Sequence, residues 1–168
     1  LYHYKVQTPF YLFDMDGDHR KEKFLVEQKD GETWLYVHSY EGDKIFSHRL
    51  KATGYGSSIY KISVRNLSPK TRVFIIHFYE GKTKHVDFHA TARFYFLTLD
   101  NSDLKTLSMF RGPAMWEEFR KVKNHYHQRK YDLSLFDFNN DGVKEILVKY
   151  KLTSKVFFYK NNGKWLRN

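Results

Sequence analysis

Short runs of alternating apolar and polar residues, separated by turn-forming residues, extend along most of this chain. In a first unit, about residues 5–50, two of the separating turns contain Asp30-Gly31 and Gly42-Asp43. Asp-Gly and Gly-Asp pairs accept positive φ angles, and between alternating runs they indicate β-hairpins. This unit therefore predicts a four-stranded antiparallel meander. Its strands are expected at residues 9–13, 24–28, 34–39 and 44–50.

The same plan recurs in a C-terminal unit, about residues 131–168. An Asn161-Asn162-Gly163 turn separates its last two expected strands. The expected strands are residues 133–136, 145–150, 156–160 and one that begins at Trp165.

A middle unit, about residues 58–111, follows a linker at 53–58 and is a degenerate copy. Moving the first unit along by 50 residues places Phe24 on Phe74 and Gly31 on Gly81. Its outer hairpin is expected at residues 94–99 and 107–110, around a turn at 100–103, with an insertion around 85–92.

The segment between the middle and C-terminal units has a different pattern. Pro113 stands near its start, glutamates follow, basic residues come later, and Met115 and Phe119 fall on one helical face. These features favour a short helix over about residues 113–123. The predicted fold is thus a single all-β domain of antiparallel four-stranded meanders, repeated about three times, with one short helix.

Two acidic loops carry the candidate chemistry of the chain. Each begins with an Asp directly after a predicted strand, at Asp14 and at Asp137, and runs into an apolar strand. In both loops oxygen-bearing side chains occupy positions 1, 3, 5 and 9. This spacing suits a hard cation such as Ca²⁺, which takes six to eight oxygens at ~2.3–2.6 Å. The residues are Asp14, Asp16, Asp18 and Glu22 in the first acidic loop (14–22), and Asp137, Asn139, Asp141 and Glu145 in the second (137–145).

The middle unit lacks this chemistry. Under the 50-residue shift, the four positions of the first acidic loop fall on Val64, Asn66, Ser68 and Arg72. We therefore expect this unit to keep the strands without the metal.

The Asp-x-Asp-x-Asp pattern with Glu at position 9 and a following apolar strand resembles the FG-GAP or VCBS-type repeat. Such repeats form the calcium-binding blades of integrin α-subunit β-propellers. The resemblance covers the first and C-terminal units well and the middle unit only in outline. An EF-hand would need Glu at position 12, where this chain has Leu25 and Val148. The resemblance implies Ca²⁺ ligands at Asp14, Asp16, Asp18 and Glu22 with the Arg20 carbonyl, and at Asp137, Asn139, Asp141 and Glu145 with the Val143 carbonyl.

Two departures from the family pattern matter. Position 6, usually Gly, is His19 in the first acidic loop and Gly142 in the second. Propellers close with about four to eight blades, more than three units can supply. We therefore expect a partial or small propeller-like array that belongs to a longer chain, stays open, or associates with further blades or with another copy of itself.

The charge of the chain indicates the class of partner. The 168 residues carry a net charge of +10, and seven of the 19 acidic residues lie in the two acidic loops. A surface otherwise rich in Lys and Arg attracts polyanions, although solubility alone also explains such a charge. The expected partner is a protein or an anionic glycan; charge alone suggests nucleic acid, which is the weaker expectation.

The compartment is expected to be extracellular, periplasmic or the cell surface, because calcium sites of extracellular modules can be weak. No apolar run approaches the ~18 residues of a membrane span. The start at Leu1 is neither an initiator Met nor a signal peptide, so we expect a processed product or an excised fragment. Cysteine is absent, which excludes disulfides and thiolate chemistry.

Other sites are weaker candidates. His85 and His89, or His125 and His127, could contribute to a zinc site, but no third ligand stands at convincing spacing. The basic stretch at 120–130 suits phosphate or sulfate contacts or a solvated face. No nucleophile, phosphate-loop or metalloprotease motif occurs. The chain is therefore interpreted as a non-catalytic calcium-stabilised binding module; the alternative is an accessory domain of a larger polysaccharide- or phosphoester-acting enzyme.

Overall fold

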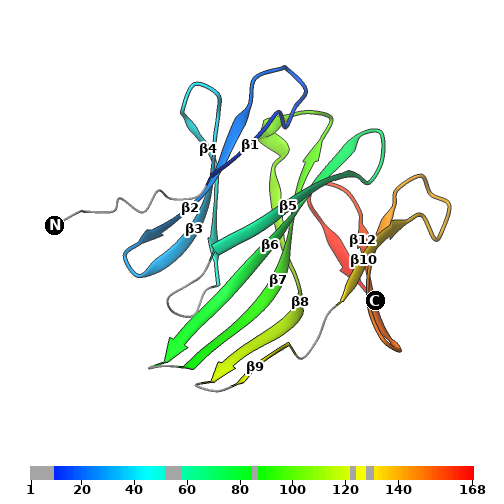
Figure 1. The fold of residues 1–168 in the computed structure, drawn as a ribbon. Helices are drawn as coiled ribbons and strands as arrows, with labels where there is room; N and C mark the ends of the chain where they lie inside the picture. The colour runs from blue at the N-terminus through cyan, green and yellow to red at the C-terminus, as the bar shows by residue number, and fades with distance from the viewer. Residues whose placement is uncertain (1–9, 52–57, 85–86, 122–123, 128–130) are drawn as a thin grey trace. The chain divides into compact units, whose positions relative to one another are not determined.

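The computed structural model shows an all-β protein (Figure 1). It describes residues 10–51, 58–84, 87–121, 124–127 and 131–168, without the side chains of residues 58, 81–90, 115–130 and 150. In these ranges every regular element is a β-strand, apart from a 3-10 turn at Leu104–Thr106. The predicted fold class is confirmed. The chain divides into two compact units, Leu1–Ala52 and Thr53–Asn168, at the predicted linker; that the whole is one domain stays a prediction.

The first compact unit contains one antiparallel sheet in the order β1-β2-β3-β4. Asp30 (φ 53°) and Gly31 (φ 76°) form the turn between β2 and β3, where two successive positive φ angles match the right-handed twist of the strands. The predicted meander is confirmed, and only Pro9 of its first strand falls outside the described residues. The strands are β1 (Phe10–Phe13), β2 (Glu22–Lys29), β3 (Glu32–His38) and β4 (Lys44–Leu50).

The second compact unit contains a five-stranded sheet and a four-stranded C-terminal sheet, both antiparallel and in sequence order. The five-stranded sheet consists of β5 (Ser58–Asn66), β6 (Thr71–Lys84), β7 (Asp87–Asp100), β8 (Ser108–Lys121) and β9 (Asn124–His127). The C-terminal sheet consists of β10 (Asp132–Phe136), β11 (Glu145–Tyr150), β12 (Thr153–Tyr159) and β13 (Trp165–Arg167).

The predicted short helix at 113–123 is wrong as far as the structure describes it, because residues through Lys121 belong to β8. Pairing with β7 outweighs the weak local helix signals. Gly112 and Pro113 lie where the β7–β8 register shifts, around Arg93. Proline is tolerated at such irregularities, and a Cβ on Gly112 would lie 2.8 Å from the Phe94 carbonyl oxygen.

The middle unit also differs from its predicted alignment. The alignment of Gly81 with the turn residue Gly31 predicts a turn, but Gly81 lies inside β6 and pairs with Ala90. Strands β6 and β7 extend past the predicted hairpin, and β9 adds a fifth strand that the repeat pattern does not contain. Cross-strand pairing therefore continues through the segment that the sequence marks as an insertion.

The two sheets of the second compact unit face each other across an aromatic core. Phe96 of β7 is fully buried, and its ring centroid lies 5.7 Å from that of Phe157 and 5.2 Å from that of Trp165. At one border of this core the Tyr159 hydroxyl donates a 2.6 Å hydrogen bond to Asp100 Oδ2. The aromatic residues that favour strands thus also join the sheets.

We expect Phe96→Ala to lower the free energy of unfolding of the second compact unit by about 3–5 kcal/mol, since it removes a buried ring and leaves a cavity. Urea unfolding followed by tryptophan fluorescence measures the change. Leu152→Ala is the control, because Leu152 is fully exposed and its removal should change stability by less than about 0.5 kcal/mol. Equal midpoints for the two variants would contradict this core assignment.

Candidate metal centres in two acidic loops

The two acidic loops occupy the same place in their sheets. The first connects β1 to β2 and the second connects β10 to β11, and each is closed by an equivalent ladder pair. These pairs are Phe13 with Glu22 and Phe136 with Glu145. The loops therefore have equal length and the same start and end points.

The backbone of the two loops also turns at the same positions. Position 4 has a positive φ angle in both, at Gly17 (82°) and Asn140 (56°), and so does position 6, at His19 (67°) and Gly142 (83°). Such angles favour Gly, and Asn and His adopt them more readily than most other residues. The departure at His19 therefore leaves the shape of the first acidic loop intact.

Equivalent hydrogen bonds hold the two loops. The position 6 amide donates to the position 1 carboxylate, and the position 7 amide donates to the position 5 carboxylate. The pairs are His19–Asp14 and Gly142–Asp137 (2.9 Å each), Arg20–Asp18 (2.8 Å) and Val143–Asp141 (2.9 Å). Ionised carboxylates have about four lone-pair sites, so these bonds orient the oxygens and leave acceptor sites for a cation.

The glutamate at position 9 of each loop is buried and bonds to the backbone near the start of the loop. Glu22 and Glu145 are both 2 % exposed. Their carboxylates accept 2.7 Å hydrogen bonds from the position 2 amides, those of Met15 and Phe138. Burial raises the pKa of Glu22, although the Met15 amide opposes this shift. The glutamates therefore tie each loop to the start of the following strand.

The structure brings three acidic side chains together in each loop. Ligand oxygens of Asp14, Asp16 and Asp18 lie within 4.8 Å of one another, and so do those of Asp137, Asp141 and Glu145. Two oxygens bound to one Ca²⁺ at ~2.3–2.6 Å can be at most about 5.2 Å apart, so both sets fit this ion.

Glu22 and Asn139 are the predicted side-chain ligands outside these two acidic sets. Glu22 bonds the Met15 amide, and the Asn139 side-chain oxygen accepts a hydrogen bond from the Asp141 amide (3.3 Å). The first set is therefore made by the aspartates alone, whereas the second includes its position 9 glutamate.

The loops differ in their neighbouring cations. Arg20 Nε lies 3.1 Å from Asp18 Oδ2, and Arg20 Nη1 lies 2.8 Å from Glu41 Oε1. The Arg20 amide, with the guanidinium, holds the pKa of Asp18 below its usual range. Burial raises the pKa of Asp16 beside it. No ion pair of Asp137 or Asp141 occurs among the described residues, so only the first loop has a guanidinium that competes with a metal ion.

The equivalent loop of the middle unit has no such cluster. Asn66 pairs with Arg72 in the β5–β6 ladder, and Val64 lies inside β5. The shorter loop between these strands buries Leu67, and Ser68 Oγ accepts the amides of two following residues. The 50-residue shift fails within this loop because the loop is shorter, and that the middle unit binds no metal stays a prediction.

The remaining sequence candidates lie outside the described side chains. These are the histidines at 85, 89, 125 and 127 and the basic stretch 120–130. Among the described residues, no helix is long and apolar enough to span a membrane.

Comparison of the chain with protein-family models, with curated proteins and with solved structures found no match. The resemblance to calcium-binding propeller repeats therefore rests on the acidic loops and their flanking strands.

We expect Glu22→Ala to lower the free energy of unfolding by about 1–3 kcal/mol in calcium-free buffer, because the buried Met15 amide loses its acceptor. Glu22→Gln keeps an acceptor oxygen and should cost less. The control is Glu27→Ala, at an exposed position of β2. Urea unfolding in EGTA gives the ranking; a Glu22→Ala variant as stable as wild type would refute this role.

Proposed function

We propose that this chain is a non-catalytic binding module of the FG-GAP or VCBS type, stabilised by calcium. The observation that carries the proposal is the equivalence of the two acidic loops. They share length, positive-φ positions and hydrogen bonds, although their residues differ at positions 2, 3, 4, 6 and 7. Two loops of different sequence that keep one shape, and that both carry oxygen-bearing side chains at positions 1, 3, 5 and 9, support a common ligand.

The role of the ion is structural. Three carboxylate-bearing side chains within one short loop repel one another. A divalent cation bound between them removes this repulsion, because all three carboxylates coordinate it. In the second acidic loop Glu145 would fix the start of β11 to the ion, because this ligand is also the first residue of that strand. Ion binding then adds to stability, since the ordered ligand set exists only in the folded state.

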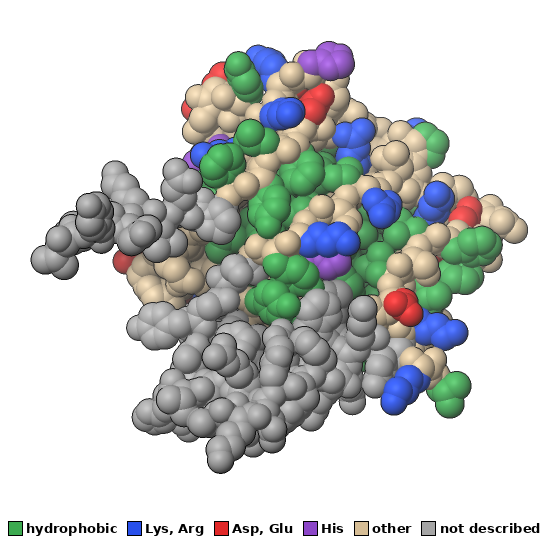
Figure 2. Space-filling model, in the orientation of Figure 1, with side chains coloured by type: hydrophobic (Ala, Val, Ile, Leu, Met, Phe, Trp, Pro, Cys, Tyr) green, Lys and Arg blue, Asp and Glu red, His purple; other side chains and the backbone are tan. Residues whose placement is uncertain are grey.

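The proposed compartment follows from the calcium affinity expected of such modules, and the proposed partner follows from the positive charge of the chain. Extracellular calcium modules work with dissociation constants of ~10⁻⁴–10⁻³ M, so we place the protein outside the cell, in a periplasm or on a cell surface. Its partner is a protein or an anionic glycan. On the face in Figure 2, basic side chains lie among hydrophobic ones along β5, which suits an anionic ligand.

Association through strand edges is also part of the proposal. Phe10 (50 % exposed) and Leu12 (49 %) lie on the edge strand β1, and Leu166 (55 %) lies on the edge strand β13. Exposed apolar edge strands favour pairing with another chain or another blade. Further blades or a second copy of the chain are the proposed occupants.

Calcium should raise the Tm of each compact unit. At a hundredfold excess over Kd one site adds about 2.7 kcal/mol, which corresponds to a rise of roughly 10–20 °C for units of this size. We expect Asp14→Asn to abolish the rise of the first unit and Asp137→Asn that of the second, because each neutralises position 1. Differential scanning calorimetry with calcium, with magnesium and with EGTA measures these shifts.

Asp103→Asn is the matched control. Asp103 is also an exposed turn aspartate, whose carboxylate accepts the Lys105 amide, but it belongs to neither cluster. This variant should keep the full calcium response. A wild-type protein whose transitions do not move in millimolar calcium would rule out the proposed stabilisation.

A further inference from the structure

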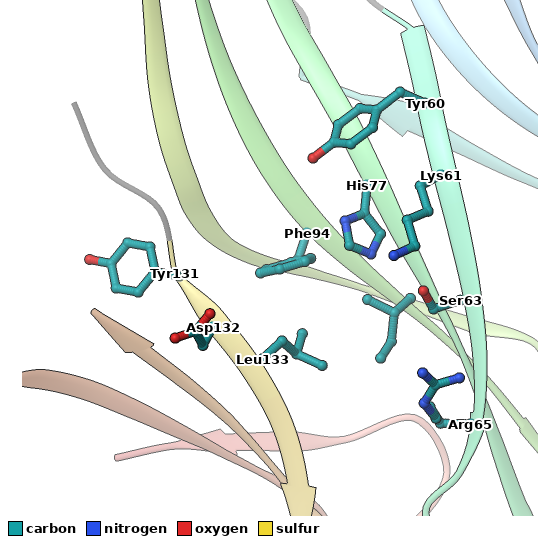
Figure 3. A pocket seen from close by; sticks show the side chains of 10 residues that line it. Tyr60, Lys61, Ser63, Arg65, His77, Phe94, Tyr131, Asp132 and Leu133 are labelled. Atoms are coloured by element: carbon teal, nitrogen blue, oxygen red, sulfur yellow. The ribbon is translucent and has the colours of Figure 1, made fainter. Parts of the chain in front are cut away.

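A cleft of about 340 Å³ opens in the second compact unit between β5 and β10. Figure 3 shows Lys61, Ser63 and Arg65 on β5, and across from them Asp132 and Leu133 on β10 with Tyr131 directly before that strand. Ligand sites for small molecules typically enclose ~300–1,000 Å³. The cleft therefore has the size for one small ligand or one residue of a polymer.

One wall of the cleft is cationic. Lys61, Ser63 and Arg65 follow one another at alternate positions of an edge strand, so their side chains share one face of the sheet. In Figure 3 the Lys61 amine and the Arg65 guanidinium extend towards Ser63 from opposite sides. Neither cation has an acidic partner in the described part of the chain. Both charges are available to a single anionic group placed over Ser63.

The floor and the opposite wall add apolar and hydrogen-bonding surface. His77 and Phe94 lie between the walls, with their ring centroids 4.9 Å apart. Burial, with the charge of Lys61, lowers the pKa of His77 to about 4, so this side chain is neutral at pH 7. Tyr60 and Tyr131 add two further rings, and the exposed Asp132 carboxylate can accept hydrogen bonds.

The charges and rings that line the cleft favour an anion with a single charge over a polyanion. The charged groups that line the cleft are Lys61, Arg65 and Asp132, which together give one net positive charge at neutral pH. A polyphosphate or nucleic-acid backbone would bring several charges close to Asp132. A sugar with one anionic group instead supplies hydroxyl donors for Asp132 and an apolar ring face for the aromatic side chains.

We propose that the cleft between β5 and β10 binds one residue of an acidic sugar, whose carboxylate or sulfate is held by Lys61 and Arg65. The inference deepens the glycan-binding part of the proposed function and assigns it to a site away from the acidic loops. Asp132 orients the sugar through its hydroxyl groups, and His77 supplies a neutral hydrogen-bonding group.

The test is isothermal titration calorimetry at physiological salt, in calcium, with three probes. These are a galacturonic acid trisaccharide, a sulfated disaccharide derived from heparin, and a neutral maltotriose. At least one acidic probe should bind about tenfold or more tightly than maltotriose, because charge-assisted hydrogen bonds are about twice as strong as neutral ones. The tighter acidic probe identifies the anionic group as carboxylate or sulfate.

Lys61→Gln and Arg65→Gln should each weaken that acidic probe about tenfold, while Lys70→Gln leaves it within twofold. Lys70 is the matched control, since it is an exposed lysine of the second unit that does not line the cleft. Asp132→Asn should reduce the preference for the sugar over inorganic phosphate. All four substituted residues are exposed, so unchanged unfolding midpoints will show that the fold persists.

Equal weakening by Lys61→Gln and Lys70→Gln would overturn the proposal, because binding would then follow net charge alone. Tighter binding of a single-stranded oligonucleotide than of either acidic sugar would also overturn it. Neither result touches the calcium response of Asp14→Asn and Asp137→Asn. Failure of the cleft and failure of the calcium proposal are therefore distinguishable.

Discussion

Hydrogen bonding between antiparallel neighbours is the constraint on which the rest of this structure depends. Backbone amides and carbonyls that leave water must find partners, and in the three sheets of the described residues neighbouring strands supply them. The ladder between β6 and β7 extends from Thr71 to Lys84 and from Asp87 to Asp100. The same pairing draws residues 113–121 into β8 despite their helical pattern. Loops form only where this pairing stops.

The acidic loops show how carboxylates replace that pairing. Between Phe13 and Glu22 the chain leaves the ladder, and side-chain oxygens accept several of the amides that strand partners would otherwise take. Glu22 accepts the amide of the buried Met15 in the same way. The carboxylates needed for these bonds are also suitable calcium ligands. The same carboxylates therefore stabilise the loop by hydrogen bonds and would coordinate the proposed metal ion.

The second acidic loop and the cleft are connected through the fold of the second compact unit. Strand β10 lines the cleft at its start, with Asp132, and leads into the loop at its end, with Phe136. The Lys144 amide of this loop donates a 2.7 Å hydrogen bond to the Leu67 carbonyl, directly after β5. The loop therefore continues one strand of the cleft wall, β10, and bonds the residue that directly follows the other, β5. An ion that orders the loop would also restrict the movement of these walls.

The sequence by itself determined the all-β class, most strand positions and the two acidic loops, because alternation and Asp-Gly turns are local signals. Only the tertiary structure decided that residues 113–121 form a strand, because their pairing with β7 is non-local. The cleft could not be found from sequence either. Lys61 and Asp132 are far apart along the chain, and the packing of two sheets across Phe96 and Phe157 brings their strands together.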